Sequence, residues 1–372
     1  MNVIFTCGGT GGHINPAIAL ANTLRRRDPN VKILFVGCVG EMEEQLVPKA
    51  GFEIKCLPGS RFFRQLNFKN IRRNVQGVGR ILSALNGARK IINEFKPDVI
   101  VGTGGYASFP ALFMGSKMGI PTCVHEANAV PGLATRLAAG SADRILVNFA
   151  ESGKAYKQQD KVTCVGMPVR SEFLYTRRAD ARRELGLDAR PLIVSAFGSL
   201  GAKAMNEVMA DFMKLETENG LPYQHIHATG SYGWEWMPGL VKGKGVDLES
   251  GSIDMREYIY NMPTLMAAAD IFISRAGASS CNEIAVSGTP CILIPSPNVT
   301  DNHQEKNARI VEQRGGCVML LEKECTAQRL YQEVQALLND GEKRSAMRKA
   351  LMESSMPDSA DRICDIICEL AK

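Results

Sequence analysis

The chain has 372 residues, 45% of them hydrophobic, which is enough for two ordinary hydrophobic cores, so we expect two domains. The formal net charge of +5, from 44 Lys and Arg against 39 Asp and Glu, is too small to indicate a nucleic-acid-binding protein. The 11 cysteines form no Cys-x-x-Cys pair, which predicts reduced, buried thiols in a cytoplasmic protein, with neither a disulfide framework nor a metal site.

The chain opens with a strand pattern at residues 3–5, followed by the glycine-rich segment 8–13 (GGTGGH) and a helical pattern. Glycine permits positive φ and a close approach of a ligand to the backbone, and the N-terminus of the next helix presents unpaired N–H groups. Pro16 fits the first turn of that helix. We interpret the segment as a candidate site for an anion or a sugar, although a plain strand-to-helix connection is the alternative. It lacks the Gly-x-Gly-x-x-Gly dinucleotide fingerprint.

Further strand patterns alternate with helical ones through the first half of the chain, at residues 31–36, 54–57, 96–101, 121–125, 143–147 and 161–165. This alternation predicts a doubly wound parallel sheet that binds its ligand at the carboxyl ends of its strands. Two of these strands lead into the loops 102–106 (GTGGY) and 125–128 (HEAN). We therefore expect both loops to converge on the first one.

Residues 62–95 combine an apolar stripe at helical spacing with several Arg and Lys. The stripe consists of Val75, Val78, Leu82 and Leu85. It fits either a helix that faces a core or an apolar patch with a basic rim that contacts an anionic membrane surface. No apolar run approaches the roughly 20 residues of a membrane span, and no signal-peptide pattern precedes the first strand, so any membrane contact is expected at the surface.

The pattern restarts after a linker at residues 166–170. A strand at 191–197, the loop 198–201 (GSLG) and a helix at 202–215 repeat the opening unit. The repeat predicts two Rossmann-like doubly wound parallel-sheet domains that face each other across a cleft. We place the first at residues 1–166, with the helix of 355–372 packing back on it, and the second at 167–354.

The second half carries candidate groups for a nucleotide sugar. The loop 198–201 can hold a diphosphate through backbone N–H groups and the Ser199 hydroxyl. Arg170 fits either a phosphate contact or a structural ion pair. Glu283 lies near a predicted helix start, where it either caps the helix or accepts two ribose hydroxyls. Because no Asp-x-Asp occurs, we expect donors and dipoles, without a metal, to meet the charge of a departing diphosphate.

His13 is the candidate general base, since an unperturbed histidine titrates near neutrality. The alternative is that His13 only hydrogen-bonds a sugar or caps the first helix. Glu126 and Asn128 follow a neighbouring strand and are placed to orient an acceptor or the histidine.

Five ordered motifs resemble one family over essentially the whole chain: GGTGGHINPA, GTGGYAS.PAL, HEAN..PG, FGS.GA...N and SRAGA....EIA..G.P.ILIP......D.HQ..NA. They are similar to those of the MurG family of peptidoglycan N-acetylglucosaminyltransferases. The resemblance implies a GT-B fold and inverting transfer of N-acetylglucosamine from UDP-N-acetylglucosamine to the C4 hydroxyl of the muramoyl sugar of lipid I, giving lipid II. A related GT-B hexosyltransferase acting on another lipid or natural product, and a non-catalytic nucleotide-sugar-binding protein, are the alternatives.

The resemblance also implies where the protein works and with what. It implies a peripheral protein on the cytoplasmic side of the cell membrane, which contacts the anionic membrane surface and other proteins of cell-wall synthesis. It implies no cofactor and no nucleic-acid partner. It further implies that the apolar stripe in 75–85 is the membrane patch.

We assign catalysis to His13 and Glu126, and the resemblance implies the surroundings of each residue. It places Thr10, Gly11, Gly12, His13 and Asn128 at the donor sugar, the first four also near its diphosphate, and Tyr106 with Glu126 on the acceptor side. It places Arg170, Ser199 and Asn206 near the diphosphate and sugar, and Ile259 at the uracil. It places Ala278, Ser279, Ser280 and Glu283 at phosphate and ribose, and His303 with Gln304 at the sugar.

Three residues depart from the family pattern. Ala127 stands where members usually read HEQN, and Phe197 and Leu200 stand where they read GGSQGA. Ala127 and Leu200 each replace a glutamine and so remove a polar side chain, whereas a cradle of main-chain N–H groups does not depend on those glutamines.

Overall fold

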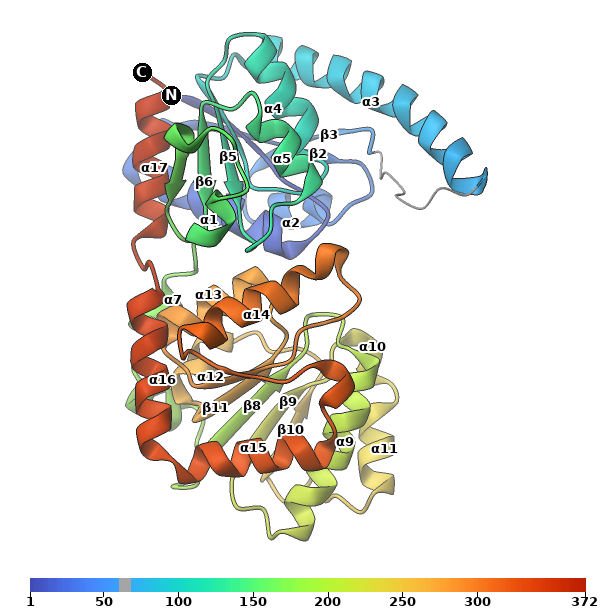
Figure 1. Ribbon diagram of the computed structural model, residues 1–372, viewed down its shortest axis with the longest axis vertical. Helices are drawn as coiled ribbons and strands as arrows, with labels where there is room; N and C mark the ends of the chain where they lie inside the picture. Colours follow the sequence, from blue (N-terminus) through green and yellow to red (C-terminus); the bar gives the residue numbers. More distant parts are fainter. Residues whose placement is uncertain (60–67) are drawn as a thin grey trace. The chain divides into compact units, whose positions relative to one another are not determined.

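The computed structural model describes residues 1–59 and 68–372, with side chains described outside 60–78. The chain divides into two compact units (Figure 1). Unit 1 comprises Met1–Val169 and Met356–Lys372, and unit 2 comprises Arg170–Ser355. The sequence predicts these boundaries at 166/167 and 354/355.

Unit 1 is built on a seven-stranded parallel sheet with the strand order β3-β2-β1-β4-β5-β6-β7. The strands are β1 Asn2–Thr6, β2 Lys32–Cys38, β3 Glu53–Leu57, β4 Val99–Gly102, β5 Thr122–Glu126, β6 Arg144–Val147 and β7 Val162–Cys164. The order reverses between β1 and β4, so the loops after these two strands lie at the switch point where such sheets bind ligands.

Helices cover both faces of this sheet (Figure 1). They are α1 Gly11–Arg27, α2 Glu43–Lys49, α3 Phe68–Phe95, α4 Ser108–Lys117, α5 Leu133–Ala139, α6 Ala150–Gly153, the 3-10 turn η1 Gln159–Lys161 and α17 Ser359–Leu370. On one face α17 packs against α1, with Ile363 and Ile367 fully buried in the same core cluster as Leu20. Arg27 also pairs with Asp361 at 2.6 Å, which ties the C-terminal helix to unit 1.

Unit 2 repeats the architecture with a six-stranded parallel sheet of order β10-β9-β8-β11-β12-β13. The strands are β8 Leu192–Ala196, β9 Gln224–Ala228, β10 Ile253–Arg256, β11 Ile271–Ser274, β12 Cys291–Leu293 and β13 Val318–Met319. The order reverses between β8 and β11. The predicted doubly wound α/β fold class is therefore confirmed.

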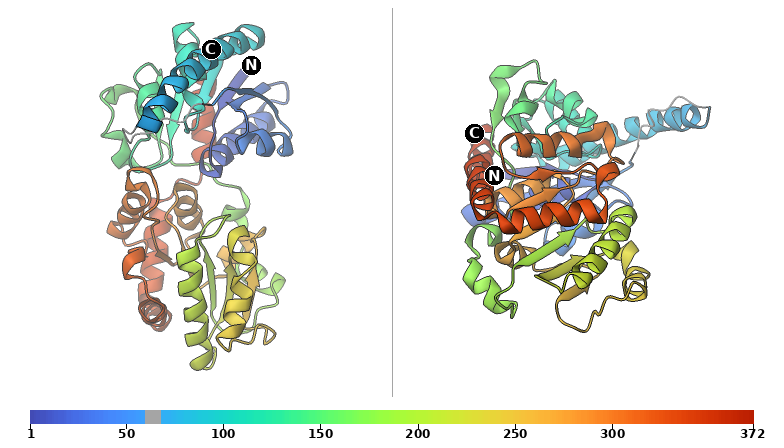
Figure 2. Two further views of the ribbon diagram at one scale, coloured as in Figure 1. Left: turned by 90° about the vertical axis from the view of Figure 1, so that its right-hand side faces the viewer. Right: turned by 60° about the horizontal axis from the view of Figure 1, so that its bottom comes forward.

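The helices of unit 2 again flank the sheet, and α9 packs beside α11 and α15 (Figure 2). They are α7 Glu172–Tyr175, α8 Arg178–Glu184, α9 Lys203–Glu218, α10 Ser231–Trp234, α11 Met237–Gly243, α12 Met262–Ala268, α13 Ala278–Ser287, α14 His303–Gln313, α15 Ala327–Asn339 and α16 Gly341–Ser354, with 3-10 turns η2 Thr300–Asn302 and η3 Glu322–Glu324. In the described parts of both units, no helix is both long and apolar enough to span a bilayer.

Candidate functional site

The loop after β1 carries His13 into the first turn of α1. Gly9 has a φ of +84°, which favours glycine. A Cβ at position 8 would lie 2.3 Å from Glu43 Oε1, so the protein's own packing excludes a side chain there. At Gly11 the nearest atom to such a Cβ would be 3.7 Å away, so packing leaves room at that position. Only part of the glycine pattern is therefore explained by the fold.

The loop after β4 packs directly on the first loop, as expected from the parallel sheet. Thr103 Oγ1 donates to the His13 carbonyl at 2.7 Å, and His13 Nδ1 lies 3.2 Å from the Thr103 carbonyl oxygen. Gly104 has a φ of +106°, and a Cβ there would lie 2.6 Å from His13 Nδ1. Because a carbonyl oxygen only accepts, Nδ1 carries the proton, and Nε2 is the basic nitrogen of the neutral ring.

Glu126 ends β5 and organises the loop that follows it. Its carboxylate is buried, and it accepts the backbone N–H groups of Asn128 at 2.9 Å and Gly132 at 3.0 Å. It also accepts the Asn128 side-chain amide at 3.3 Å. These contacts give Glu126 a positioning role for the loop, and its catalytic assignment stays a prediction.

Two further side chains of unit 1 position the loops. The fully buried His125 donates from Nε2 to the Gly166 carbonyl at 2.8 Å, and burial lowers its pKa. The Tyr106 hydroxyl, predicted on the acceptor side, donates to Glu41 Oε1 at 2.5 Å. Glu41 and the neighbouring Glu43 were missed by the sequence analysis, because a glutamate near a helix start looks like an ordinary surface residue.

In unit 2, the loop after β8 approaches the backbone after β9 closely. Gly201 has a φ of +79°, and a Cβ there would lie 2.0 Å from the Thr229 carbonyl oxygen. Asn206, predicted near the diphosphate, is buried and donates to the same carbonyl at 2.7 Å. It therefore anchors the base of the loop, whereas Ser199 and Leu200 are exposed at its tip.

The segment after β11 enters α13 through Gly277, and Ala278–Ser280 form the first turn. Glu283 lies in the second turn, so the capping alternative for it is wrong. Burial raises the pKa of Glu283 to about 7, and the Arg170 guanidinium opposes that rise. Arg170 also lies over the Phe173 ring, 5.2 Å from its centroid. Arg170 and Glu283 are thus close enough to interact.

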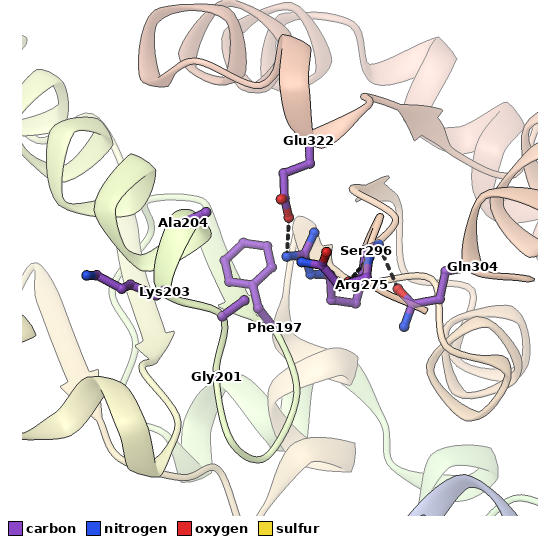
Figure 3. Close-up of a pocket in the computed structure, with 10 residues that line it drawn as sticks. Phe197, Gly201, Lys203, Ala204, Arg275, Ser296, Gln304 and Glu322 are labelled. Carbon is purple, nitrogen blue, oxygen red and sulfur yellow. Dashed lines mark hydrogen bonds and ion pairs between the residues drawn. The ribbon is translucent and has the colours of Figure 1, made fainter. Parts of the chain in front are cut away.

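A pocket of about 360 Å³ opens beside this region (Figure 3). It is lined by Phe197, Gly201, Ala202, Lys203, Ala204, Arg275, Ser296, Asn298, Gln304 and Glu322. Arg275 forms an ion pair with Glu322, donates to the Ile294 carbonyl at 3.1 Å and lies 5.8 Å from the centroid of the Phe197 ring. Sequence reasoning missed Arg275 as a site residue, although its place directly after β11 was the available signal.

The remaining predicted residues of unit 2 are spread around this pocket. Gln304 lines it and accepts the Ser296 N–H at 2.9 Å. His303 begins α14, with Nδ1 2.8 Å from the Thr300 carbonyl. Ile259 is buried after β10 and does not line this pocket. The Ser279 hydroxyl is buried and has no hydrogen-bond partner in the described parts of the chain.

The predicted membrane patch lies on α3. Leu82 is 59% exposed, whereas Leu85 is half-buried and Ala84 and Ala88 face the core. Val75 and Val78 lie outside the residues whose side chains are described. The described part of α3 therefore has a core face and at least one large apolar side chain in solvent.

Comparison with known proteins identifies the family. The glycosyltransferase family 28 N-terminal domain matches residues 3–147, and the family's C-terminal domain matches residues 192–363. The UDP-N-acetylglucosamine–N-acetylmuramyl-(pentapeptide) pyrophosphoryl-undecaprenol N-acetylglucosamine transferase of Acetivibrio thermocellus is 40% identical over 373 residues, covering 100% of this chain and 99% of that protein. The chain belongs to this glycosyltransferase family. The predicted MurG-family membership and transferase activity are confirmed.

Two further matches agree with this family assignment. The Thermoanaerobacter sp. protein of the same name is 39% identical over 368 residues, 99% of each chain. The crystal structure of Acinetobacter baumannii MurG has a TM-score of 0.77 at 24% identity, covering 99% of each chain. At that identity the structural match shows the fold alone, and it confirms the predicted GT-B class.

Proposed function

We propose that this family 28 transferase moves N-acetylglucosamine from UDP-N-acetylglucosamine to the muramoyl sugar of lipid I, giving lipid II. The observation that carries the proposal is the 40% identity, over the whole chain, to a protein named for this transfer. The arrangement of each unit supports it, since glycine loops lie at the switch points of both sheets.

Unit 2 is the proposed donor site. The N–H groups of the loop 198–201 and of the first turn of α13 suit the diphosphate, and the dipole of α13 favours negative charge there. Glu283, in its ionised form, accepts the two ribose hydroxyls. As the bond between C1 of the sugar and the diphosphate oxygen breaks, these main-chain donors stabilise the leaving group.

Unit 1 is the proposed acceptor site. The C4 hydroxyl oxygen of the muramoyl sugar attacks C1 of N-acetylglucosamine on the face opposite the diphosphate, so the configuration at C1 inverts. His13 Nε2 takes the proton of that hydroxyl, and the Thr103 carbonyl oxygen accepts the Nδ1 proton and holds the ring. Glu126 keeps the loop of Asn128 in place.

The acceptor carries an undecaprenyl chain, so the enzyme is expected to work at a membrane surface as a peripheral protein. The exposed Leu82 on α3, with the nearby Arg80, Arg89 and Lys90 also exposed, supports contact between this face and anionic lipid on the cytoplasmic side. Other proteins of cell-wall synthesis stay expected partners.

One experiment tests donor, acceptor and reaction together. The chain is incubated with labelled UDP-N-acetylglucosamine and a short-chain lipid I analogue, and the expected result is label in the lipid product and release of UDP. Turnover of UDP-glucose or UDP-galactose but not UDP-N-acetylglucosamine would favour the related hexosyltransferase. Tight UDP binding without product from any acceptor would favour a nucleotide-sugar-binding protein.

A further inference from the structure

Glu43 is a fully buried glutamate beneath the loop that carries His13. It lies at the start of α2, and its two carboxylate oxygens face different segments. Oε2 accepts the N–H of Gly9 at 3.0 Å, and Oε1 accepts the N–H of Cys38, at the end of β2, at 3.0 Å. One side chain therefore joins the loop after β1 to the neighbouring strand.

Two glycines are explained by this carboxylate. A Cβ at Gly8 would lie 2.3 Å from Glu43 Oε1, and a Cβ at Gly37 would lie 2.5 Å from Glu43 Cγ. Any larger residue at either position would displace the glutamate. The sequence thus keeps two side-chain-free positions around a single buried acid, which indicates that its location is specific.

The loop connects this acid to His13 through a short run of main chain. Gly9 is followed by Thr10, whose carbonyl accepts the N–H groups of His13 at 3.0 Å and Ile14 at 3.2 Å. A shift of Gly9 therefore moves the carbonyl that anchors the first turn of α1. The turn just before α2 also holds the second loop, since Tyr106 donates to Glu41.

We propose that Glu43 is a positioning residue for the transfer reaction: by holding the Gly9 N–H it fixes the loop 9–12, and with it the imidazole of His13. This inference rests on the proposed function, in which His13 takes the acceptor proton. Glu43 itself touches no substrate in this scheme, and it acts through the main chain alone.

The test compares Glu43→Gln with Glu44→Gln. Glutamine keeps the size of Glu43 but offers one acceptor oxygen in place of two, so one of the two N–H groups loses its partner. Glu44 is the matched control, because the same substitution falls one residue later on an exposed side chain that accepts the Gly40 N–H at 2.7 Å.

We expect Glu43→Gln to lower kcat by about 10- to 100-fold, the loss that follows when a reacting group is displaced by about 1 Å. The KM for UDP-N-acetylglucosamine should stay within about twofold of the wild-type value, because misplacing a reacting group acts on the chemical step. The proposed donor residues also lie mostly outside this loop. Glu44→Gln should match the wild type. Equal kcat for the two variants, or a rise in KM as large as the fall in kcat, would overturn the proposal.

Hydrogen exchange supplies a readout that needs no acceptor. The amides of residues 9–13 should exchange faster in Glu43→Gln than in Glu44→Gln or the wild type, and unchanged exchange overturns the proposal. If the wild type shows no turnover, the proposed function fails while exchange still tests the loop. Should Glu43→Gln not fold, Glu43→Asp keeps the charge but draws the oxygens back by one carbon, and it should show the same exchange and kcat effects.

Discussion

Glu283 accepts the ribose hydroxyls in the proposed function, so its raised pKa should make donor binding depend on pH. Burial moves this pKa to about 7, so the carboxyl is largely protonated at mildly acid pH and ionised at mildly alkaline pH. Only the ionised form accepts hydrogen bonds from two ribose hydroxyls through both of its oxygens. The affinity for UDP-N-acetylglucosamine should therefore rise with pH, and Glu283→Gln should remove that rise.

The size of the effect follows from the titration. With a pKa of about 7, the ionised fraction rises from about 9% at about pH 6 to about 91% at about pH 8. The dissociation constant should therefore fall by up to about tenfold over this interval, or about 1.4 kcal/mol. If the protonated form still accepts one ribose hydroxyl, the change is smaller but keeps its sign.

Isothermal titration calorimetry with UDP-N-acetylglucosamine measures this directly. The nucleotide sugar is preferable to UDP, because its diphosphate is esterified at both ends and lacks the terminal phosphate proton that UDP loses near neutral pH. The variant retains His303, so the difference between the wild type and Glu283→Gln isolates the carboxyl. A wild-type affinity that is the same at both pH values, or a variant with the same slope, would refute the reasoning.

Three further predictions concern separate parts of the chain. His13→Ala should lower kcat by about 10²–10⁴-fold with donor affinity within about twofold, and an unchanged rate removes His13 as the base. Leu82→Glu should weaken sedimentation with anionic vesicles. Met352→Glu, at a similarly exposed apolar position on α16 in unit 2, should not. Equal sedimentation of the two variants contradicts a membrane role for α3. Burial holds the pKa of His227 well below 6.5, so this histidine takes up a proton more readily in the unfolded chain than in the folded one. The urea midpoint should therefore fall as the pH drops below about 6.5. A His227→Gln variant whose midpoint falls equally steeply would exclude this group.

The fold could be predicted at those strands whose burial requires a run of apolar residues in the sequence. Strands of parallel sheets are covered on both faces, so residues 3–5 and 191–197 appear as nearly continuous hydrophobic segments, each followed by glycines. The order of these segments along the chain was enough to predict two doubly wound sheets.

The strand β9 was not predicted, because its sequence QHIHA looks polar. The structure buries both histidines in a chain of hydrogen bonds: Ser195 Oγ lies 2.8 Å from His225 Nε2 and 2.7 Å from His227 Nδ1, and His225 Nδ1 lies 3.0 Å from Glu216 Oε2. Their burial depends on partners that lie outside the strand itself, on β8 and α9. Composition alone does not reveal such a network.

The glycines of the first loop show a second limit of prediction from sequence. In GGTGGH, Gly8 makes room for Glu43, Gly9 has a positive φ, and Gly11 has space on its open side. From the sequence, ligand approach and a plain strand-to-helix connection both stay open for this pattern, since one residue type serves all of these purposes. The purpose of each glycine can be told only from its φ and from the side chains next to it in the folded protein.

The neighbouring Glu43 also bears on which of the two loops suits the donor diphosphate better. The resemblance placed both GGTGGH and GSLG near it. A carboxylate bonded to Gly9 beneath the first loop uses one of its N–H groups and opposes a second anion there. The pocket beside the second loop is lined by two cations, Lys203 and Arg275, and by one anion, Glu322, which pairs with Arg275. The local charges therefore favour the loop 198–201 for the diphosphate and the loop 8–13 for uncharged sugar hydroxyls and the proton transfer at His13.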